Sequence, residues 1–216
     1  MLAPASEAPG PDHLTISPSV LYFGTPVTLI VTRNPDGTAN MTPMSSAWAL
    51  GPSVVLGLLA DGQGAGNLRR HGECTLNFPS AELWPRVERI ARATGRDPVP
   101  AYKAAIGYTH VADKFALGGF TQQASDLVDV PRILECPIQL EAKVKALHED
   151  EDRQDGATPV RRVIVDVEVV RVHAHRDIVV PGTNHIDTAR WNPLFYIFRH
   201  YFGNAAFLGK TFKAEV

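Results

Sequence analysis

Two long segments of alternating side chains, residues 138–147 and 160–173, constrain the fold more than any other feature. In the second segment two sets of side chains face opposite sides of a strand: Val163, Val165, Val167, Val169 and Arg171 on one side, and Ile164, Asp166, Glu168, Val170 and Val172 on the other. The acidic residues between the segments predict an exposed hairpin end. Because strands and helices do not alternate regularly along the chain, we expect a mainly β protein, a barrel with a few short peripheral helices.

An earlier segment predicts a second hairpin. From Pro26 onward Val27, Leu29 and Val31 alternate with Thr28, Ile30 and Thr32. Residues 34–37 follow with the sequence Asn-Pro-Asp-Gly, in which proline fixes φ and glycine tolerates positive φ, so this tetrapeptide is predicted to form the turn.

The stretch from Thr25 to Phe78, which includes this hairpin, is the candidate ligand site. Apolar runs at 53–59 and 74–78 predict two more strands, and residues 67–71 before Gly72 predict a short helix that begins at Asn67. The glycine-rich loop 61–66 precedes this helix. A loop that leads into a helix N-terminus presents backbone N–H groups, which suits a phosphorylated ligand.

The remaining segments are less regular. Residues 82–94 have helical spacing with an early Pro85 and a closing Gly95, and residues 108–121 predict a loop or a short helix. Rich in proline and small residues, positions 1–13 predict a flexible N-terminal tail, so that residues 14–216 form a single domain.

Composition excludes several classes of protein. The 216 residues are 44% hydrophobic and 20% charged with a formal net charge of −2, and the basic residues are scattered, which gives no general attraction to nucleic acid. We find no apolar stretch of the roughly 18 residues that a membrane span needs and no leader-like N-terminus, so we expect a cytoplasmic protein. Cys74 and Cys136 are expected to be buried free thiols.

An ordered set of motifs resembles the flavin reductase-like proteins, which bind FMN on a split β-barrel. The matching segments are VTLIVTRNPDG, NMTPMSSAWAL, VVLGLL, NLRRHGECTLNFP, DKFALGGF at 113–120, ECPIQLEAKV at 135–144, and a closing segment at 185–203 that ends in FRHYFG. The resemblance covers the chain from about Gly24 to Gly203 and implies a split β-barrel that binds FMN, or alternatively FAD or riboflavin.

The resemblance also implies which residues contact the flavin. The segment from Asn40 to Trp48 would follow the flavin ring, with hydroxyls at its polar edge and apolar side chains on its face, through Asn40, Thr42, Met44, Ser45, Ser46 and Trp48. An alternative is that the Ser and Thr residues are only the outward side chains of a strand.

The predicted phosphate loop departs from the family pattern. Relatives carry hydroxyl side chains there, whereas this chain has Asp61, Gly62, Gln63 and further glycines before Asn67. Losing one hydrogen bond to a phosphate costs roughly 1.5 to 3 kcal/mol. The site is therefore expected to bind FMN weakly, to recruit Arg69 or Arg70, or to be an ordinary surface loop.

Five further positions are considered for function. In the closing segment, the resemblance places His200 near a nicotinamide as the catalytic candidate and Phe202 beside the flavin, although both also suit a dimer contact. Lys114 is a candidate for phosphate or second-substrate binding, or a solvated helix residue. His173 and His175 share a strand face, but no third ligand is visible, so no metal site is predicted.

The predicted function is an FMN-dependent oxidoreductase of the NAD(P)H:flavin reductase type, which passes reduced flavin or electrons to a partner monooxygenase or a small acceptor. Since the chain lacks a G-x-G-x-x-G fingerprint, NAD(P)H would bind by stacking on the flavin. The alternative is a split-barrel electron carrier without reductase activity. The aromatic closing segment predicts a homodimer.

Overall fold

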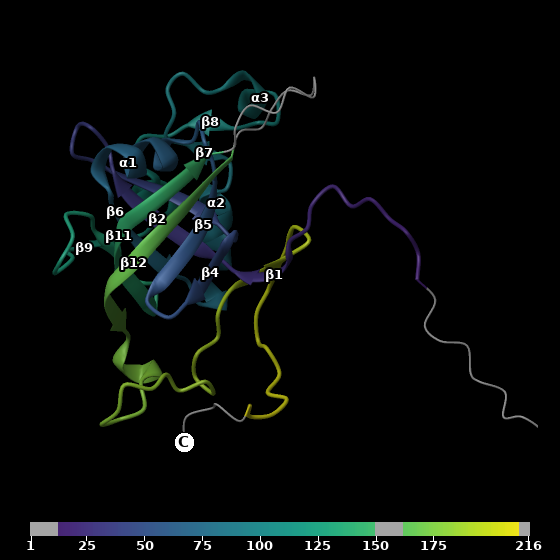
Figure 1. Ribbon diagram of the computed structural model, residues 1–216, viewed down its shortest axis with the longest axis vertical. Coiled ribbons are helices and arrows are strands. Elements are labelled where there is room, and N and C mark those ends of the chain that lie inside the picture. Colours follow the sequence, from purple (N-terminus) through teal and green to yellow (C-terminus); the bar gives the residue numbers. More distant parts are fainter. Residues whose placement is uncertain (1–12, 150–161, 212–216) are drawn as a thin grey trace, which may run out of the picture.

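The computed structural model describes residues 13–149 and 162–211. Its main element is a seven-stranded antiparallel sheet with the strand order β3-β2-β6-β11-β12-β5-β4 (Figure 1). These strands are β2 Thr28–Arg33, β3 Ala39–Met44, β4 Ala47–Leu50, β5 Ser53–Leu59, β6 Glu73–Phe78, β11 Ile138–Glu149 and β12 Arg162–Ala174. The predicted tail lies outside the described residues except for His13.

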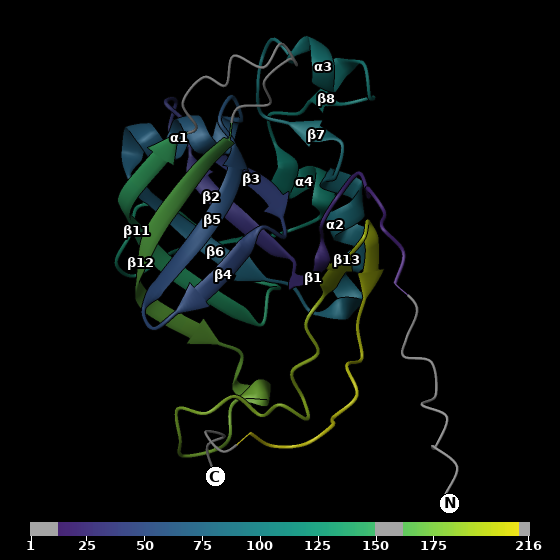
Figure 2. The same cartoon turned by 45° about the vertical axis from the view of Figure 1, so that its right-hand side comes forward.

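The order of the strands explains why the sheet curls. Its two edge strands, β3 and β4, are consecutive in the sequence and are joined only by Ser45 and Ser46. A connection this short brings the two edges together, so the sheet rolls into a barrel that stays open between β3 and β4. Figure 2 shows this rolled sheet with β4 crossing in front of β2 and β6.

The longest hairpin confirms the strand prediction. β11 and β12 pair antiparallel from Ile138–Ala174 to Glu149–Val163, and the register shifts twice along the way. Val163, Val165 and Val167 are fully buried, as their alternation predicted. The first two residues of the predicted segment, 160 and 161, and most of the acidic run lie outside the described residues.

The N-terminal hairpin also forms as predicted. Strand β2 pairs with β3 from Thr28–Met44 to Arg33–Ala39. Asn34, Asp36 and Gly37 close it: Gly37 takes a φ of 84°, and the Asp36 carboxylate accepts hydrogen bonds from the backbone N–H and the hydroxyl of Thr38.

The helix near the predicted phosphate loop begins earlier than expected. Helix α1 spans Gln63–His71 instead of beginning at Asn67, and it ends at Gly72 in the left-handed conformation, as predicted. Gly64 and Gly66 are weak helix formers, which hid the true start. Tertiary packing nevertheless favours glycine at position 64, because the Cβ atom of any other residue there would lie 2.8 Å from Thr42 Oγ1.

The middle of the chain covers one end of the barrel. The predicted helix over 82–94 is shorter in the structure and consists of η1 Ala81–Leu83 and α2 Trp84–Ile90, followed by strand β7 Ala93–Thr94. Pro85 lies in the first turn of α2, where it costs no hydrogen bond. Helix α3 Ala101–Ala104, strand β8 Thr109–His110 and helix α4 Lys114–Gly118 follow, and α4 is the predicted short helix.

The remaining small elements complete the fold. Strands β1 Phe23–Pro26, β13 Phe195–Ile197 and β14 His200–Phe202 form a three-stranded sheet, so the closing segment lies against the start of the chain (Figure 2). Strands β9 Gln122–Gln123 and β10 Arg132–Ile133 pair, and η2 covers Arg176–Ile178. Within the described residues no helix is long and apolar enough to cross a membrane.

Two hydrophobic clusters support the sheet. One lies between β2, β3 and helices α2 and α4, and the other fills the barrel between β5, β6, β11, β12 and α1. Cys136 belongs to the first and Cys74 to the second, and both are buried free thiols, as predicted. Burial raises the pKa of Cys74 to about 12, so this thiol is unreactive.

Replacing a buried side chain of the barrel should destabilise the fold strongly. Leu76 on β6 is fully buried, so we expect Leu76→Ala to lower the free energy of unfolding by about 2–5 kcal/mol. Urea denaturation measures this loss. Leu134→Ala, at a side chain that is 45% exposed, is the matched control and should change stability by under about 0.5 kcal/mol. Equal effects of the two variants would contradict this description of the core.

Candidate functional site

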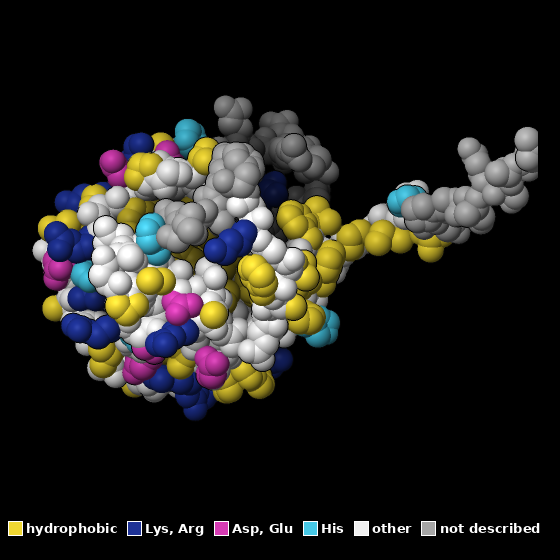
Figure 3. Space-filling model, turned by 90° about the horizontal axis from the view of Figure 1, so that it is seen from below, with side chains coloured by type: hydrophobic (Ala, Val, Ile, Leu, Met, Phe, Trp, Pro, Cys, Tyr) yellow, Lys and Arg dark blue, Asp and Glu magenta, His cyan; other side chains and the backbone are white. Residues whose placement is uncertain are grey.

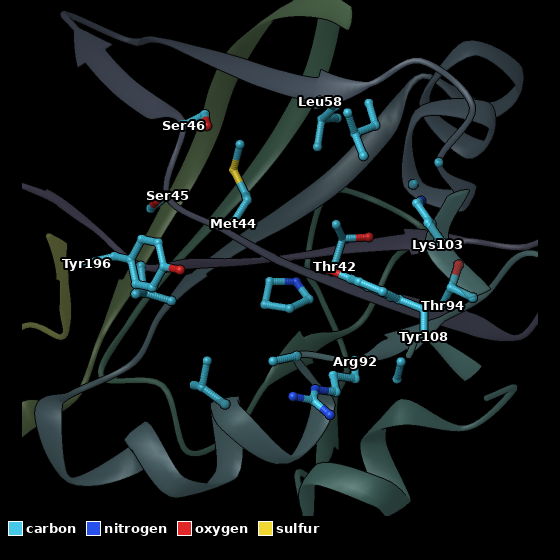
Figure 4. A pocket seen from close by; sticks show the side chains of 18 of the residues that line it. Thr42, Met44, Ser45, Ser46, Leu58, Arg92, Thr94, Lys103, Tyr108 and Tyr196 are labelled. Atoms are coloured by element: carbon cyan, nitrogen blue, oxygen red, sulfur yellow. The ribbon is translucent and has the colours of Figure 1, made fainter. Parts of the chain in front are cut away.

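A cavity of about 650 Å³ opens where the barrel is split. The end of β3, the β3–β4 connection and β5 line one side, and the start of α1, helix α2, strand β7 and the β13–β14 hairpin line the rest. Figure 4 shows Thr42 and Met44 near its middle, with Tyr196 at one end and Lys103 and Thr94 at the other. The open seam of the barrel therefore forms a pocket with two chemically different ends.

The middle of the cavity has an apolar face and a row of hydroxyls. Met44 and Leu58 point into it from β3 and β5, while Thr42, Ser45 and Ser46 supply hydroxyl groups (Figure 4). Gly57 donates its backbone N–H to the Ser46 carbonyl at 2.8 Å, which ties the connection to β5. A planar ring with polar edges fits such a wall.

Positive charge gathers at one end of the cavity. Lys103, on α3, and Lys114, on α4, are buried, and Arg92 is exposed beside them. Within the described residues none of the three forms an ion pair, although buried cations are normally paired. Such a set of charges is complementary to an anionic ligand.

The position of Lys114 is fixed by two hydrogen bonds. Its Nζ donates to Asn40 Oδ1 at 3.1 Å and to the Met41 carbonyl at 2.8 Å. Burial, with a smaller effect from the charge of Lys103, lowers the pKa of Lys114 to about 8. Burial also lowers the pKa of Lys103. Both ammonium groups are destabilised, so a bound anion would stabilise their charged forms.

The first turn of α1 faces the same end. Gly62, Gln63, Gly64 and Ala65 line the cavity, and the backbone N–H groups at a helix N-terminus carry partial positive charge. The first turn contains no acidic residue. Two glycines permit this packing: a Cβ on Gly64 would crowd Thr42, and a Cβ on Gly95 would lie 2.9 Å from Gln63 Cγ.

Asp61 does not line the cavity. Instead its carboxylate accepts a hydrogen bond from the Tyr102 hydroxyl, with oxygen–oxygen distances of 2.8 and 2.9 Å. The expected compensating arginines lie elsewhere: Arg69 pairs with Glu149 at 2.7 Å, and Arg70 donates to the Arg33 carbonyl. Neither is among the lining residues, so the structure does not place the alternative of a compensating Arg69 or Arg70 at this cavity.

Two predicted contact residues instead support the site from behind. Asn67 is buried in the middle of α1 and donates to Asn34 Oδ1 at 2.8 Å and Thr32 Oγ1 at 3.0 Å. Asn40 is buried on β3 and bonds Lys114. Neither side chain lines the cavity, so each acts on it through the residues that it holds.

The opposite end of the cavity is aromatic. Tyr22, Tyr196 and Tyr201 line it, and the Tyr201 hydroxyl donates to Glu88 Oε2 at 3.0 Å. His200 and Phe202, the predicted residues of this segment, are exposed and do not line it. Because side chains alternate along a strand, their neighbour Tyr201 faces the cavity instead. Trp48 is also outside the lining and is 59% exposed.

The two histidines considered as metal ligands have other partners. His173 Nε2 lies 2.6 Å from Glu141 Oε1, and His175 Nε2 lies 3.0 Å from the Leu134 carbonyl. Glu141 with His173 and Asp126 forms the single group of three potential ligands in the described part of the chain. Burial acts to raise the pKa of Glu141. Hydrogen bonds from backbone amides, that of Asp126 first, and from His173 have the larger combined effect, so the pKa of Glu141 is lowered and its charged form is stabilised.

Comparisons with known proteins agree with this architecture. Residues 20–205 match the model of the flavin reductase like domain. The chain belongs to the flavin reductase-like family. An uncharacterised relative in this comparison, YdfE of Bacillus subtilis (strain 168), is 42% identical over 200 residues, which are 93% of each chain.

Solved structures show the same fold at low sequence identity. Flavoredoxin of Desulfovibrio vulgaris (Miyazaki F) matches with a TM-score of 0.73 and 21% identity over 94% of this chain and 99% of its own. Component B of nitrilotriacetate monooxygenase from Bacillus cereus matches with a TM-score of 0.69 and 16% identity over 95% and 100%. The predicted mainly β split barrel is thereby confirmed for this flavin reductase-like chain.

Several cavity residues of this flavin reductase-like domain were not predicted. Lys103 comes from the segment around α3, for which no element was predicted, and Arg92 from residues 82–94, whose helical spacing does not distinguish it from a surface cation. Tyr22 precedes the first strand, and Tyr196 lies in the closing segment. Only the aromatic character of that closing segment was a usable signal.

Stability of the ligand-free protein should rise between pH 8 and 10. The folded pKa of Lys114, about 8, lies below its unfolded value of about 10.4, so in this window the unfolded chain binds more protons. We expect the free energy of unfolding to gain up to roughly 1.4 kcal/mol per pH unit from this group. Urea denaturation at a series of pH values tests this.

The substitution Lys114→Met should remove most of that pH dependence. Lys145→Met is the control, because Lys145 is an exposed residue of β11. Identical slopes for wild type and Lys114→Met would show that the Lys114 ammonium is not destabilised by burial.

Proposed function

We propose that this protein is an FMN-dependent oxidoreductase of the NAD(P)H:flavin reductase type. One observation carries the proposal: two buried lysines, which form no ion pair with any described residue, line the same cavity as the first turn of α1, and the middle of that cavity suits a planar ring. Membership of the flavin reductase-like family supports the same assignment.

The residues present fit FMN. Its phosphate would lie against the first turn of α1, where Lys103 and Lys114 supply positive charge and Gly64 allows close approach. The ring would lie along Thr42 to Ser46, with Met44 and Leu58 against its face. When bound, FMN supplies the two-electron redox chemistry, and the protein positions it and excludes water.

The cavity leaves room for a second reactant at the aromatic end. NAD(P)H is proposed as the reductant, and a monooxygenase or a small molecule as the acceptor. The name of the structural neighbour from nitrilotriacetate monooxygenase fits the first kind of acceptor. Lys and Arg side chains are mixed with Asp and Glu on the face shown in Figure 3, which gives no basic patch for nucleic acid there. A cytoplasmic location remains a prediction.

A flavin-binding electron carrier is the second candidate. Its supporting observation is the loop before α1, which contains no hydroxyl side chain to hold the phosphate. Flavoredoxin, a structural neighbour, carries a name that fits this role. The carrier would bind FMN without oxidising NADH or NADPH.

Adding FMN to the purified protein should give a bound-flavin absorbance spectrum that NADH or NADPH bleaches. Fluorescence titration gives the FMN affinity, with riboflavin and FAD as comparisons. If riboflavin, which lacks the phosphate, bound as tightly as FMN, the proposed phosphate site would be wrong. A bound flavin that neither nucleotide reduces would favour the carrier.

The variant Lys103→Met should weaken FMN binding by about ten- to hundredfold, because a charge-assisted hydrogen bond is worth roughly 1.5–3 kcal/mol. Riboflavin binding should change little. Lys145→Met, at the exposed position on β11, is the control and should bind FMN like the wild type. An unchanged FMN affinity in Lys103→Met would remove Lys103 from the phosphate site.

We also propose that the protein is a homodimer. Large apolar side chains remain exposed beside the seam of the barrel, among them Phe23, Trp48, Leu50 and Phe202. Monomeric proteins seldom leave such a group uncovered. A second chain would cover it and place the predicted residues Trp48 and Phe202 inside an interface.

Light scattering should therefore give twice the mass of one chain. Trp48→Asp should shift the protein to monomers, because burying a carboxylate in an apolar interface is costly. Leu134→Asp, at an exposed position directly after β10, is the control and should leave the mass unchanged. A wild-type monomer at micromolar concentration would refute the proposed dimer.

A further inference from the structure

The aromatic end of the cavity has the geometry of a second binding site. The ring centroids of Tyr22 and Tyr196 are 5.4 Å apart at 61°, and those of Tyr196 and Tyr201 are 5.5 Å apart at 56°. Burial raises the pKa of Tyr196, so its hydroxyl stays neutral near pH 7. Inclined rings of this kind present edges and faces to a further flat ring.

The turn between β13 and β14 is strained. Phe198 and Arg199 form the two-residue connection between β13 and β14, with φ values of 42° and 70°. A two-residue hairpin loop with both φ angles positive normally contains Asn and Gly. Bulky residues in this conformation cost stability, and such strain is concentrated at functional sites.

Arg199 is held at the cavity by this turn. The Phe198 N–H donates to the Tyr22 carbonyl at 2.6 Å, which fixes the hairpin against the start of the chain. Arg199 lines the cavity, and its guanidinium makes no hydrogen bond or ion pair with any described residue. Glu88 also lines this end, but one of its carboxylate oxygens accepts the Tyr201 hydroxyl.

We propose that the aromatic end binds a planar aromatic carboxylate, with its ring against Tyr22, Tyr196 and Tyr201 and its carboxylate on Arg199. This inference rests on the proposed function, since it names the chemical class of the small-molecule acceptor that would bind beside the flavin. Arginine suits the task because its planar fork of N–H donors matches the two oxygens of a carboxylate.

Two features of the cavity favour a carboxylate over a neutral ligand. Arg199 offers several donors, and at neutral pH it has no acceptor among the described residues. The proposed phosphate site lies at the other end of the cavity from the aromatic end, as the positions of Lys103 and Tyr196 show in Figure 4. A carboxamide, such as that of a nicotinamide, would instead use both Arg199 and Glu88.

Benzoate is the test probe, with benzamide and cyclohexanecarboxylate as analogues that lack the charge or the flat ring. Calorimetric titration is done on protein saturated with FMN and on protein without flavin. Benzoate is expected to bind at least tenfold more tightly than either analogue. Because FMN binding is measured separately, failure of the flavin assignment and failure of this inference give different results.

Two variants separate binding from folding. Arg199→Gly should lose benzoate affinity by about ten- to hundredfold, because the charge-assisted bonds are lost. Its melting temperature should stay equal or rise, since glycine suits the positive φ of this turn. Arg176→Gln, at an arginine of η2 outside the cavity, is the control and should bind benzoate like the wild type.

Three results would overturn the proposal. They are benzoate binding that Arg199→Gly leaves unchanged, equal binding of cyclohexanecarboxylate, and tighter binding of benzamide that Glu88→Gln abolishes. The last of these would assign the aromatic end to a carboxamide ligand instead.

Discussion

The short connection between β3 and β4 is the constraint on which the site depends. Because only Ser45 and Ser46 join the two edge strands of the sheet, the barrel closes around them but leaves a seam. Helix α1 and the segment from α2 to α4 pack over this seam and enclose a cavity. The same geometry that completes the barrel therefore creates the ligand site, without a separate binding domain.

Within that cavity, the cost of burying Lys114 indicates that the site suits an anionic ligand. A lysine held by two neutral acceptors, without a carboxylate, destabilises the ligand-free fold. Asp61, the carboxylate of the loop before α1, is turned toward Tyr102 instead. A phosphate would supply the missing negative charge, so binding of the proposed FMN would also stabilise the fold.

Much of the fold was predictable, because it follows from local patterns. The alternation of side chains predicted strand β12 and its buried valines from Val163 onward. The turn sequence from Asn34 to Gly37 predicted the first hairpin. The start of α1 was not predictable, since the need for glycine at position 64 comes from the close approach of Thr42 on strand β3. Lys103 and Tyr22 reach the cavity only through the tertiary fold, so no spacing in the sequence marks them.

The structure brings only part of the predicted site together at the cavity. Thr42, Met44, Ser45 and Ser46 line the cavity as expected, whereas its basic end comes from segments that the sequence left irregular. A crystal structure of the protein with FMN tests the account most directly. It should show the phosphate at the first turn of α1 beside Lys103 and the ring along Thr42 to Ser46. A flavin bound outside this seam, or with its phosphate toward Tyr196, would contradict the account.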